Sequence, residues 1–444
     1  MGRALFGTDG IRGKAGVFPL DARTIRRVGA ALVKVLPEGA TRLLIGRDTR
    51  ESGEWIEKEL AHGATSSGAA VHSVGVAPTP SVAYLTSALQ FDAGVVISAS
   101  HNPYHDNGIK VFSGSGEKYS EHLEERIERL VADTSWQMAE GGAPEVSHAD
   151  YLRAYLDHAR AVFPNPEALG KFRIVVDCAN GAMTTVAPRL LEEMGLDATI
   201  IAASPDGRNI NEHCGSTHPE ILAKAVTSSG YGLGVAFDGD GDRAMFVDAR
   251  GRILDGDHVL LMCAKQMKAE GRLRGNAVVA TVMSNIGLEL GLKKLGIDLV
   301  RTTVGDKYVM EEMQKRNLSL GGEQSGHIIF SDYLFTGDGL VTALNVMRTI
   351  AVTGREVADL ADDLTTYPQV LMNVRVTEKP DLKTVPAVAA VIDHVEKQLA
   401  GRGRLLIRYS GTEPLLRVML EGQNTDDIET MGQAIVTAVR GAGL

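Results

Sequence analysis

Three aspartates alternate with glycines in the segment DGDGDR, directly after the apolar, strand-like stretch GLGVAF. Glycines let a loop fold so tightly that Asp238, Asp240 and Asp242 converge, and that much negative charge requires a divalent ion with hard oxygen ligands. An EF-hand also begins D-x-D-x-D, but its twelfth position would be Ala249 instead of Glu. A solvated acidic turn is the remaining alternative. The spacing therefore favours a metal site at these three aspartates.

A second chemical segment, ISASHNPYHDNGIKVF at 97–112, follows a buried-type strand. It places Ser100 beside His101, with Lys110 further along the chain. A serine hydroxyl becomes a nucleophile only when a base or a metal activates it, and both kinds of partner are present here. A loop with capping and turn roles alone is the alternative. Ser100 is the candidate nucleophile.

Near the end of the chain, IRYSGTEPLLRVM at 407–419 offers two arginines and two hydroxyls around Gly411. A Ser-Gly-Thr turn between strands presents N–H groups and hydroxyls, and arginines supply paired donors. That combination suits a phosphate dianion, whereas a hairpin with surface arginines is the plain alternative. The residues are Arg408, Ser410, Thr412 and Arg417.

Two further segments are weaker signals taken singly. GGEQSGH at 321–327 places Glu323, Ser325 and His327 in a glycine-rich turn, suited to sugar hydroxyls and a proton shuttle. A structural turn is the alternative there. GTDGIRG at 7–13 presents Arg12, which we expect in a flexible loop. Together the segments supply a nucleophile, a cation site, residues that bind sugar hydroxyls and a phosphate-binding loop. Phosphoryl transfer needs this set of groups.

These segments must be positioned by an α/β fold. Short Val- and Ile-rich runs alternate with amphipathic stretches, which indicates βαβ units with parallel or mixed sheets. The predicted strands lie at 42–46, 93–98, 172–177, 231–237 and 276–282. Several end in polar turns, where ligands of open α/β sheets bind. The final part changes to strand, helix, strand, strand, so a small α+β unit closes the chain.

At 444 residues the chain is longer than a single hydrophobic core ordinarily supports, so several domains are expected. Composition changes predict domains at 1–150, 151–252, 253–366 and 367–444. The second boundary falls at a predicted hairpin, DARGRILDG, and the third precedes the C-terminal unit.

The formal net charge of −10 disfavours nucleic acid as a partner. Three cysteines without CxxC spacing suggest neither a disulfide framework nor a cysteine zinc site, and favour a cytoplasmic location. No apolar run approaches the length of a membrane helix, and no signal peptide is evident, so no membrane partner is expected.

Five segments resemble the signatures of the α-D-phosphohexomutase superfamily, and they occur in the same order along the chain. From residue 7 to residue 413 they read GTDGIRG, SASHNP, DGDGDR, GEQSGH and RYSGTEP. The resemblance implies three related α/β domains with mixed sheets around a central cleft, plus a smaller C-terminal α+β domain. It implies a phosphoserine at Ser100 and one Mg²⁺ held by Asp238, Asp240, Asp242 and Ser100 or its phosphate.

The resemblance also implies roles for residues around these two. Arg243 would hold the phosphoryl environment, and Lys110 and His327 would serve as general base and acid. The substrate-binding residues implied are Arg12, His101, Asn102, Glu323, Ser325, Arg408, Ser410, Gly411, Thr412 and Arg417.

The segment GEQSGH resembles the one found in the branch of the family that interconverts glucosamine 6-phosphate and glucosamine 1-phosphate, on the route to UDP-N-acetylglucosamine. Enzymes of the family that act on mannose and glucose phosphates typically carry GEMSGH instead. The small-molecule partner would be a sugar phosphate, with a sugar 1,6-bisphosphate as intermediate and activator. The oligomeric state stays open, and a homodimer through the first domain is compatible with the family. Alternatives are a mutase for glucose or mannose phosphates, a metal-dependent sugar phosphatase, and a non-catalytic sugar-phosphate sensor.

Overall fold

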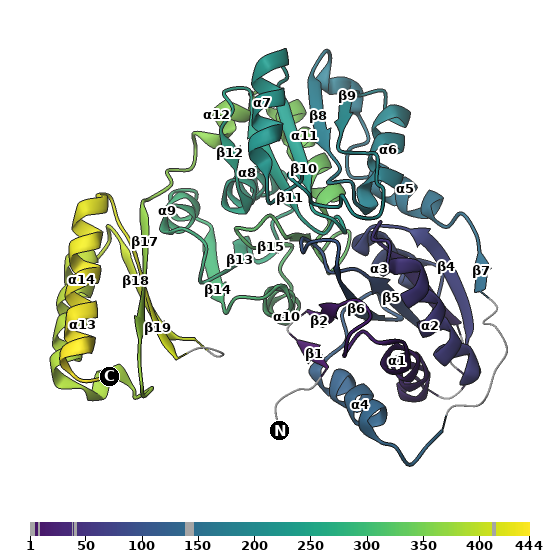
Figure 1. Ribbon diagram of the computed structural model, residues 1–444. Helices are drawn as coiled ribbons and strands as arrows, with labels where there is room; N and C mark the ends of the chain where they lie inside the picture. Colours follow the sequence, from purple (N-terminus) through teal and green to yellow (C-terminus); the bar gives the residue numbers. More distant parts are fainter. Residues whose placement is uncertain (1–4, 8, 38, 40–41, 138–145, 411–413) are drawn as a thin grey trace. The chain divides into compact units, whose positions relative to one another are not determined.

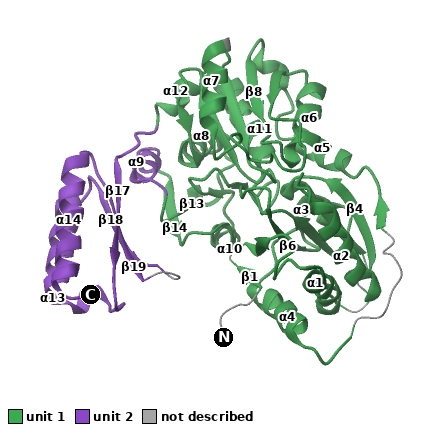
Figure 2. Cartoon of the chain, viewed as in Figure 1, with its two compact units in different colours: residues 1–283, 296–363 green, residues 284–295, 364–444 purple. Residues whose placement is uncertain are grey.

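The computed structural model of the chain describes residues 5–7, 9–37, 39, 42–137, 146–410 and 414–444 (Figure 1). The described chain forms two compact units (Figure 2). One unit contains residues 1–283 and 296–363, and the other contains residues 284–295 and 364–444. Mixed sheets with helices build the first unit, and an antiparallel sheet with helices builds the second, so the predicted α/β class with a small C-terminal sheet is confirmed.

The first sheet has the strand order β1-β2-β6-β5-β3-β4-β7. Its strands are β1 (Phe6–Gly7), β2 (Gly10–Lys14), β3 (Arg42–Arg47), β4 (Ala70–Val76), β5 (Ala93–Ile97), β6 (Asp106–Ser113) and β7 (Val146–His148). Every residue of β5 is buried, and β3 is buried from Leu43 to Gly46. Continuous burial is typical of strands covered on both faces. The strands predicted at 42–46 and 93–98 are therefore confirmed as β3 and β5.

Helices α1 (Ala22–Val35), α2 (Gly53–Ser66), α3 (Thr79–Ala88) and α4 (Glu121–Ala132) accompany this sheet. α1 begins where the Asp21 side chain accepts a 3.0 Å hydrogen bond from the Thr24 N–H, which satisfies a donor that the helix itself leaves unpaired. α3 starts at the Pro78–Thr79–Pro80 segment. The polar residues that follow β3 and β5 lie at the carboxyl ends of neighbouring parallel strands.

The second sheet has the order β12-β11-β10-β8-β9. Its strands are β8 (Arg173–Asp177), β9 (Asp197–Ile201), β10 (Leu233–Phe237), β11 (Ala244–Asp248) and β12 (Ile253–Leu254), with helices α5 (Leu152–Arg160), α6 (Ala187–Glu193) and α7 (Pro219–Ser229). β10 pairs in parallel with β8 and antiparallel with β11. The DGDGDR segment is the tight connection between β10 and β11, and the predicted hairpin near 248–256 is present as β11 and β12.

The third sheet has the order β14-β13-β15-β16. It contains β13 (Ala277–Thr281), β14 (Asp298–Thr302), β15 (Leu320–Gly322) and β16 (Ile328–Phe330), with helices α8 (Gly256–Ala269), α10 (Asp306–Arg316), α11 (Gly339–Thr353) and α12 (Val357–Ala361). The GEQSGH segment joins the antiparallel strands β15 and β16.

The C-terminal unit contains the antiparallel sheet β17-β19-β18, formed by β17 (Gln369–Arg375), β18 (Arg404–Tyr409) and β19 (Leu415–Glu421). Its helices are α13 (Pro386–Leu399), α14 (Thr425–Gly441) and α9 (Ile286–Lys294). The predicted order of strand, helix, strand and strand is confirmed, and α14 follows it. α9 joins this unit because the buried Glu421 accepts a 3.1 Å hydrogen bond from the Ile286 N–H.

Among the described residues, no helix combines the length and the apolar character needed to cross a bilayer.

Candidate active site

Asp238, Asp240 and Asp242 form a buried cluster after β10, and their carboxylate oxygens lie within 4.8 Å of one another. Asp240 is flanked by Gly239 and Gly241. Gly241 has a φ of +73°, a conformation that glycine adopts without strain. At Gly239, an added Cβ would lie 2.6 Å from the Ser100 carbonyl oxygen. The glycines therefore allow both the tight turn and the close approach of the serine loop, as their spacing predicted.

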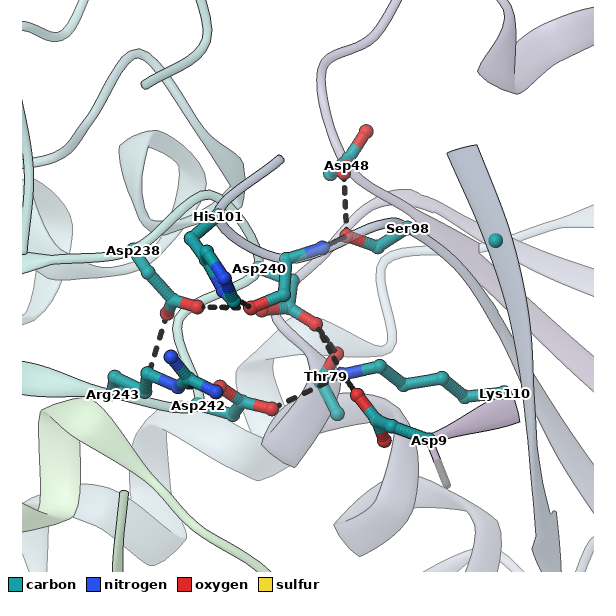
Figure 3. Close-up of polar contacts among 12 residues, drawn as sticks. Asp9, Asp48, Thr79, Ser98, His101, Lys110, Asp238, Asp240, Asp242 and Arg243 are labelled. Atoms are coloured by element: carbon teal, nitrogen blue, oxygen red, sulfur yellow. Dashed lines mark hydrogen bonds and ion pairs between the residues drawn. The ribbon is translucent and has the colours of Figure 1, made fainter. Parts of the chain in front are cut away.

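Neighbouring groups hold both oxygens of Asp238 and one oxygen each of Asp240 and Asp242 (Figure 3). Asp238 Oδ2 accepts from Ser100 Oγ at 2.6 Å. Asp240 Oδ2 accepts from Lys110 Nζ at 2.9 Å, and Asp242 Oδ2 accepts from the same ammonium at 3.1 Å. By contrast, Asp240 Oδ1 and Asp242 Oδ1 are buried and accept no hydrogen bond from the part of the chain that the structure describes. Buried carboxylate oxygens without donors fit a hard cation.

The electrostatics of the cluster agree with that fit. Burial raises the pKa of Asp238 well above its usual range, and repulsion from Asp242 and Asp240 adds to the effect. Burial opposes ionisation of Asp242 as well, but Lys110, His327 and Arg243 outweigh it and lower its pKa. The raised pKa of Asp238 reflects burial together with repulsion between neighbouring carboxylates, and a divalent cation bound among them would relieve that repulsion. An oxygen-preferring divalent cation is the group that such a donor set suits.

Ser100 lies in the loop between β5 and β6, where its sequence position predicted it. The residue is 1% exposed and has a φ of +52°, so its backbone is held in the left-handed region. Its N–H donates to Ser98 Oγ at 2.9 Å, and its own Oγ lies 3.3 Å from His101 Nδ1. Such a conformation persists only where surrounding contacts determine it.

Those contacts come largely from Arg50 and Asp48, which the sequence analysis did not single out. The buried Arg50 guanidinium donates to the Ser100 and Asn102 carbonyl oxygens, both at 2.9 Å, and to the Pro103 carbonyl at 2.5 Å. Asp48 pairs with Arg50 at 2.9 Å and accepts from Ser98 Oγ at 2.5 Å. The available signal was the segment GRDTR after the strand RLLI, since polar residues at the carboxyl end of a buried strand mark a site.

Lys110 projects from β6 into the carboxylate cluster and is 2% exposed. Burial alone would lower its pKa, but Asp240, Asp242 and Asp9 outweigh burial and raise the pKa well above its ordinary value. Lys110 is therefore an ammonium ion that joins the cation loop to the first sheet.

Arg12 corrects one expectation. The sequence predicted a flexible loop, but Arg12 lies in β2, opposite Gly108 of β6. The antiparallel partner strand is distant in sequence, so local composition did not reveal the pairing. Its guanidinium forms an ion pair with Asp9. Burial lowers the pKa of His101, as do the positive charges of Arg243 and Arg12. Arg12 and Arg243 thus supply the positive charge on the Ser100 side of the cluster, and they favour the neutral form of His101.

The GEQSGH turn contributes a buried histidine. His327 Nε2 lies 3.5 Å from Asp306 Oδ2 and 4.0 Å from Asp242 Oδ2. Glu323 Oε1 accepts a 3.1 Å hydrogen bond from the Gly305 N–H, and Ser325 is exposed. Asp306, which begins α10 and was not predicted, also pairs with Lys118. The only sequence signal for Asp306 was a polar turn after the β14 segment.

Asn102 is close to the cluster in sequence but satisfies its own loop, because its side chain donates to Asp106 at 3.0 Å. Gln324, beside Glu323, donates to Asp255 Oδ2 at 3.0 Å.

The predicted phosphate-binding loop belongs to the C-terminal unit. Arg408 of β18 and Arg417 of β19 are direct cross-strand partners, so their side chains lie on the same face of that sheet. Ser410 follows β18, and its carbonyl accepts a 2.6 Å hydrogen bond from Lys379. Gly411 and Thr412 lie outside the described residues.

Four family models match the chain in sequence order. They are described as phosphoglucomutase/phosphomannomutase alpha/beta/alpha domain I at residues 3–138, domain II at 153–251, domain III at 255–367, and the C-terminal domain at 371–438. Curated relatives include the phosphoglucosamine mutase of Syntrophotalea carbinolica, 46% identical over 446 residues, with 99% of this chain and 98% of the relative covered. The phosphoglucosamine mutase of Solibacter usitatus is 47% identical, with 99% of each chain covered.

Solved structures share the fold. A phosphoglucomutase/phosphomannomutase family protein from Burkholderia thailandensis matches with a TM-score of 0.82 and 23% identity, covering 100% of this chain and 98% of that one. An N-acetylphosphoglucosamine mutase from Aspergillus fumigatus, in complex with GlcNAc-6P and magnesium, matches with a TM-score of 0.68 and 19% identity, covering 99% of this chain and 96% of that one.

Proposed function

The chain belongs to the phosphoglucomutase/phosphomannomutase family, and we propose that it is a phosphoglucosamine mutase, which interconverts glucosamine 6-phosphate and glucosamine 1-phosphate. The choice of sugar is supported by curated relatives that are named phosphoglucosamine mutase. They are 46% and 47% identical to this chain, and the match covers nearly their whole length. The observation that carries the reaction type is the hydroxyl of a buried serine, Ser100, set 2.6 Å from a carboxylate of a three-aspartate cluster.

In the proposed reaction Ser100 carries a phosphoryl group in the resting enzyme. The sugar hydroxyl attacks this phosphorus, so that a phosphorus–oxygen bond to the sugar forms while the bond to Ser100 breaks, and the product is a sugar bisphosphate. The bisphosphate then turns round and returns its other phosphoryl group to Ser100. In the first transfer the attacking sugar hydroxyl loses a proton and the departing Ser100 oxygen gains one. In the second transfer the Ser100 hydroxyl loses a proton and the departing oxygen of the sugar gains one, so protons balance over the cycle.

Asp238, Asp240 and Asp242 are the proposed ligands of one Mg²⁺, together with Ser100 or its phosphate. When bound, Mg²⁺ would supply charge neutralisation at the transferring phosphoryl group. The two carboxylate oxygens without donors support this assignment. The backbone N–H of Arg243 donates to Asp238 Oδ1 at 3.1 Å, which stabilises the loop, and its guanidinium would contact the transferring phosphoryl group.

Lys110 and His327 are the proposed general base and acid. Both contact Asp242, which supports a shared position at one side of the cluster. Lys110 must first release a proton to act as a base, because its carboxylate neighbours favour the ammonium form. Arg12, His101 and Asn102 are proposed to contact the ligand from the first sheet, with Glu323 and Ser325 reading its hydroxyls.

The C-terminal unit is proposed to bind the phosphate that is not transferred, through Arg408, Ser410, Gly411, Thr412 and Arg417. The paired position of Arg408 and Arg417 on one sheet face supports a two-arginine contact. The division into domains at 1–150, 151–252, 253–366 and 367–444 is part of this proposal. A cytoplasmic location and a homodimer through the first domain are proposed from the family likeness alone.

A coupled assay tests the proposal. Purified protein with Mg²⁺ and a sugar bisphosphate primer would be given glucosamine 6-phosphate, glucose 1-phosphate or mannose 1-phosphate. Preference for glucosamine 6-phosphate is expected. Equal turnover of glucose or mannose phosphates would refute the sugar assignment, and release of inorganic phosphate at the rate of isomerisation would indicate a phosphatase. Ser100 is 1% exposed, which leads us to expect slow hydrolysis.

A further inference from the structure

Thr79, the first residue of α3, contacts Asp240 twice. Its N–H donates to the Asp240 carbonyl oxygen at 2.8 Å, and its hydroxyl donates to Asp240 Oδ2 at 2.7 Å. Both Thr79 and Asp240 are fully buried. The two residues are 161 positions apart, and the matched family ranges place them in domains I and II respectively. Figure 3 shows Thr79 beside the carboxylate cluster.

The contact also serves α3. The first N–H groups of a helix have no partner within the helix, and the Asp240 carbonyl supplies one for Thr79. The partly positive end of the helix in turn favours the negative charge of the Asp240 carboxylate. Cluster and helix end therefore stabilise each other across a domain boundary.

The effect on the carboxylate is geometric. Thr79 and Lys110 both donate to Oδ2 of Asp240, so the plane of the carboxylate is restrained from two directions. The other oxygen, Oδ1, is left buried and without a donor from the described residues. A ligand whose orientation is set by an outer hydrogen bond loses less freedom when it binds a cation. Because Oδ2 is held by two donors, Oδ1 is the oxygen of Asp240 that would bind a cation.

We propose that Thr79 is a positioning residue for the divalent cation, acting through Asp240, and that its hydroxyl increases the affinity of the site. The proposal rests on the cation site assigned to the three aspartates above. Thr79 does not touch the cation itself. It links the domain that carries Ser100 to the loop that carries the carboxylates, and so fixes the position of the carboxylates relative to Ser100.

The test measures Mg²⁺ binding without catalysis, by isothermal titration of the dephosphorylated, sugar-free full chain. Thr79→Val keeps the branched shape and removes only the hydroxyl, so the Mg²⁺ dissociation constant is expected to rise by roughly 10- to 100-fold. Thr79→Ser keeps the hydroxyl and is expected to stay within about threefold of wild type. Thr79→Ala provides a second variant without the hydroxyl, for which the same rise as in Thr79→Val is expected.

Thr86 supplies the matched control. It lies on the same helix, is fully buried, and donates its hydroxyl to the Val82 carbonyl at 2.7 Å instead of to a carboxylate. Thr86→Val should leave Mg²⁺ affinity unchanged. Thermal unfolding with and without Mg²⁺ gives an independent readout, because a cation that binds only the folded state raises the midpoint, and the rise should shrink in Thr79→Val.

Wild-type affinity in Thr79→Val and Thr79→Ala would overturn the proposal, as would an equal loss of affinity in Thr79→Ser or in Thr86→Val. Absence of Mg²⁺ binding by the wild-type chain would instead overturn the cation site on which the proposal rests. The two failures are therefore distinguishable.

Discussion

Ser100 Oγ donates a 2.6 Å hydrogen bond to Asp238 Oδ2, although the two residues are 138 positions apart. The serine comes from the turn after β5, and the aspartate comes from the turn after β10. Two strand ends from different sheets thus meet at one hydroxyl. The contact brings the proposed nucleophile to the proposed cation site.

Replacement of Ser100 by Ala should abolish phosphoryl transfer. Within the described part of the chain, Ser100 is the hydroxyl that donates to Asp238, so kcat is expected to fall by roughly 10³-fold or more. The unfolding midpoint should change little, because alanine removes only the hydroxyl. The coupled assay and the mass of the phosphoprotein are the measurements. Full mutase activity in Ser100→Ala would refute the phosphoserine mechanism.

Removal of one carboxylate should weaken cation binding. Asp242→Asn converts a charged oxygen ligand into an amide, and the Mg²⁺ concentration for half-maximal activity is expected to rise by roughly 10-fold or more. Chelation with EDTA should stop turnover in wild type, and added Mg²⁺ should restore it. Asp248→Asn is the control, since Asp248 is equally buried at the end of β11 but binds Arg252 and lies outside the cluster. An equal rise in both variants would contradict a specific ligand role.

Arg50→Lys should lower kcat while leaving KM nearly unchanged. Lysine cannot reproduce the forked contacts to the Ser100, Asn102 and Pro103 carbonyls. Ser100 would then be held less firmly, which is expected to reduce kcat by roughly 10- to 100-fold. Arg47→Lys is the control, because Arg47 is the last residue of β3, lies three positions before Arg50, and pairs with Glu54 and Glu57 instead of with the serine loop. A change confined to KM would contradict a positioning role.

Arg417→Ala should mainly raise KM for the sugar phosphate. Loss of one charge-assisted contact to phosphate costs about 1.5–3 kcal/mol, which corresponds to a rise of roughly 10- to 100-fold. The exposed Arg402, in the turn before β18, provides a control in Arg402→Ala. A kcat defect without a KM defect would place Arg417 outside phosphate binding.

Asp338 should make stability depend on pH. Burial raises its pKa to about 6 from 3.8, against hydrogen bonds from the Val341 N–H and the Tyr155 hydroxyl that lower it. Between these values the folded state binds more protons than the unfolded state, so stability falls as pH rises. The loss amounts to as much as about 3 kcal/mol once the pH exceeds the folded pKa.

Asp338→Asn cannot ionise and should not show that loss. Unfolding midpoints of both proteins, measured from about pH 4 to about pH 7, should therefore diverge in favour of the variant as pH rises. Parallel curves would show that Asp338 is ionised throughout in the folded protein.

The candidate chemical residues could be predicted from the sequence, because residue spacing and glycine content determine which side chains converge within a single turn. DGDGDR predicted convergent carboxylates, and the polar loop after an apolar strand predicted a candidate nucleophile at Ser100. The strands β3, β5, β8, β10 and β13 were predicted from Val- and Ile-rich runs, since continuous burial leaves that pattern. The family likeness then implied a role for each segment.

The contacts that position these groups depended on the tertiary structure. Thr79 donates to Asp240 across 161 residues, and Arg50 holds the Ser100 carbonyl across 50. Arg12 was misjudged as a loop residue because its partner strand β6 is distant in the chain. Helix α9 joined the C-terminal unit through Glu421, 135 residues from Ile286. Local spacing determines which side chains can converge in one turn, whereas strand pairing and helix docking determine which turns meet.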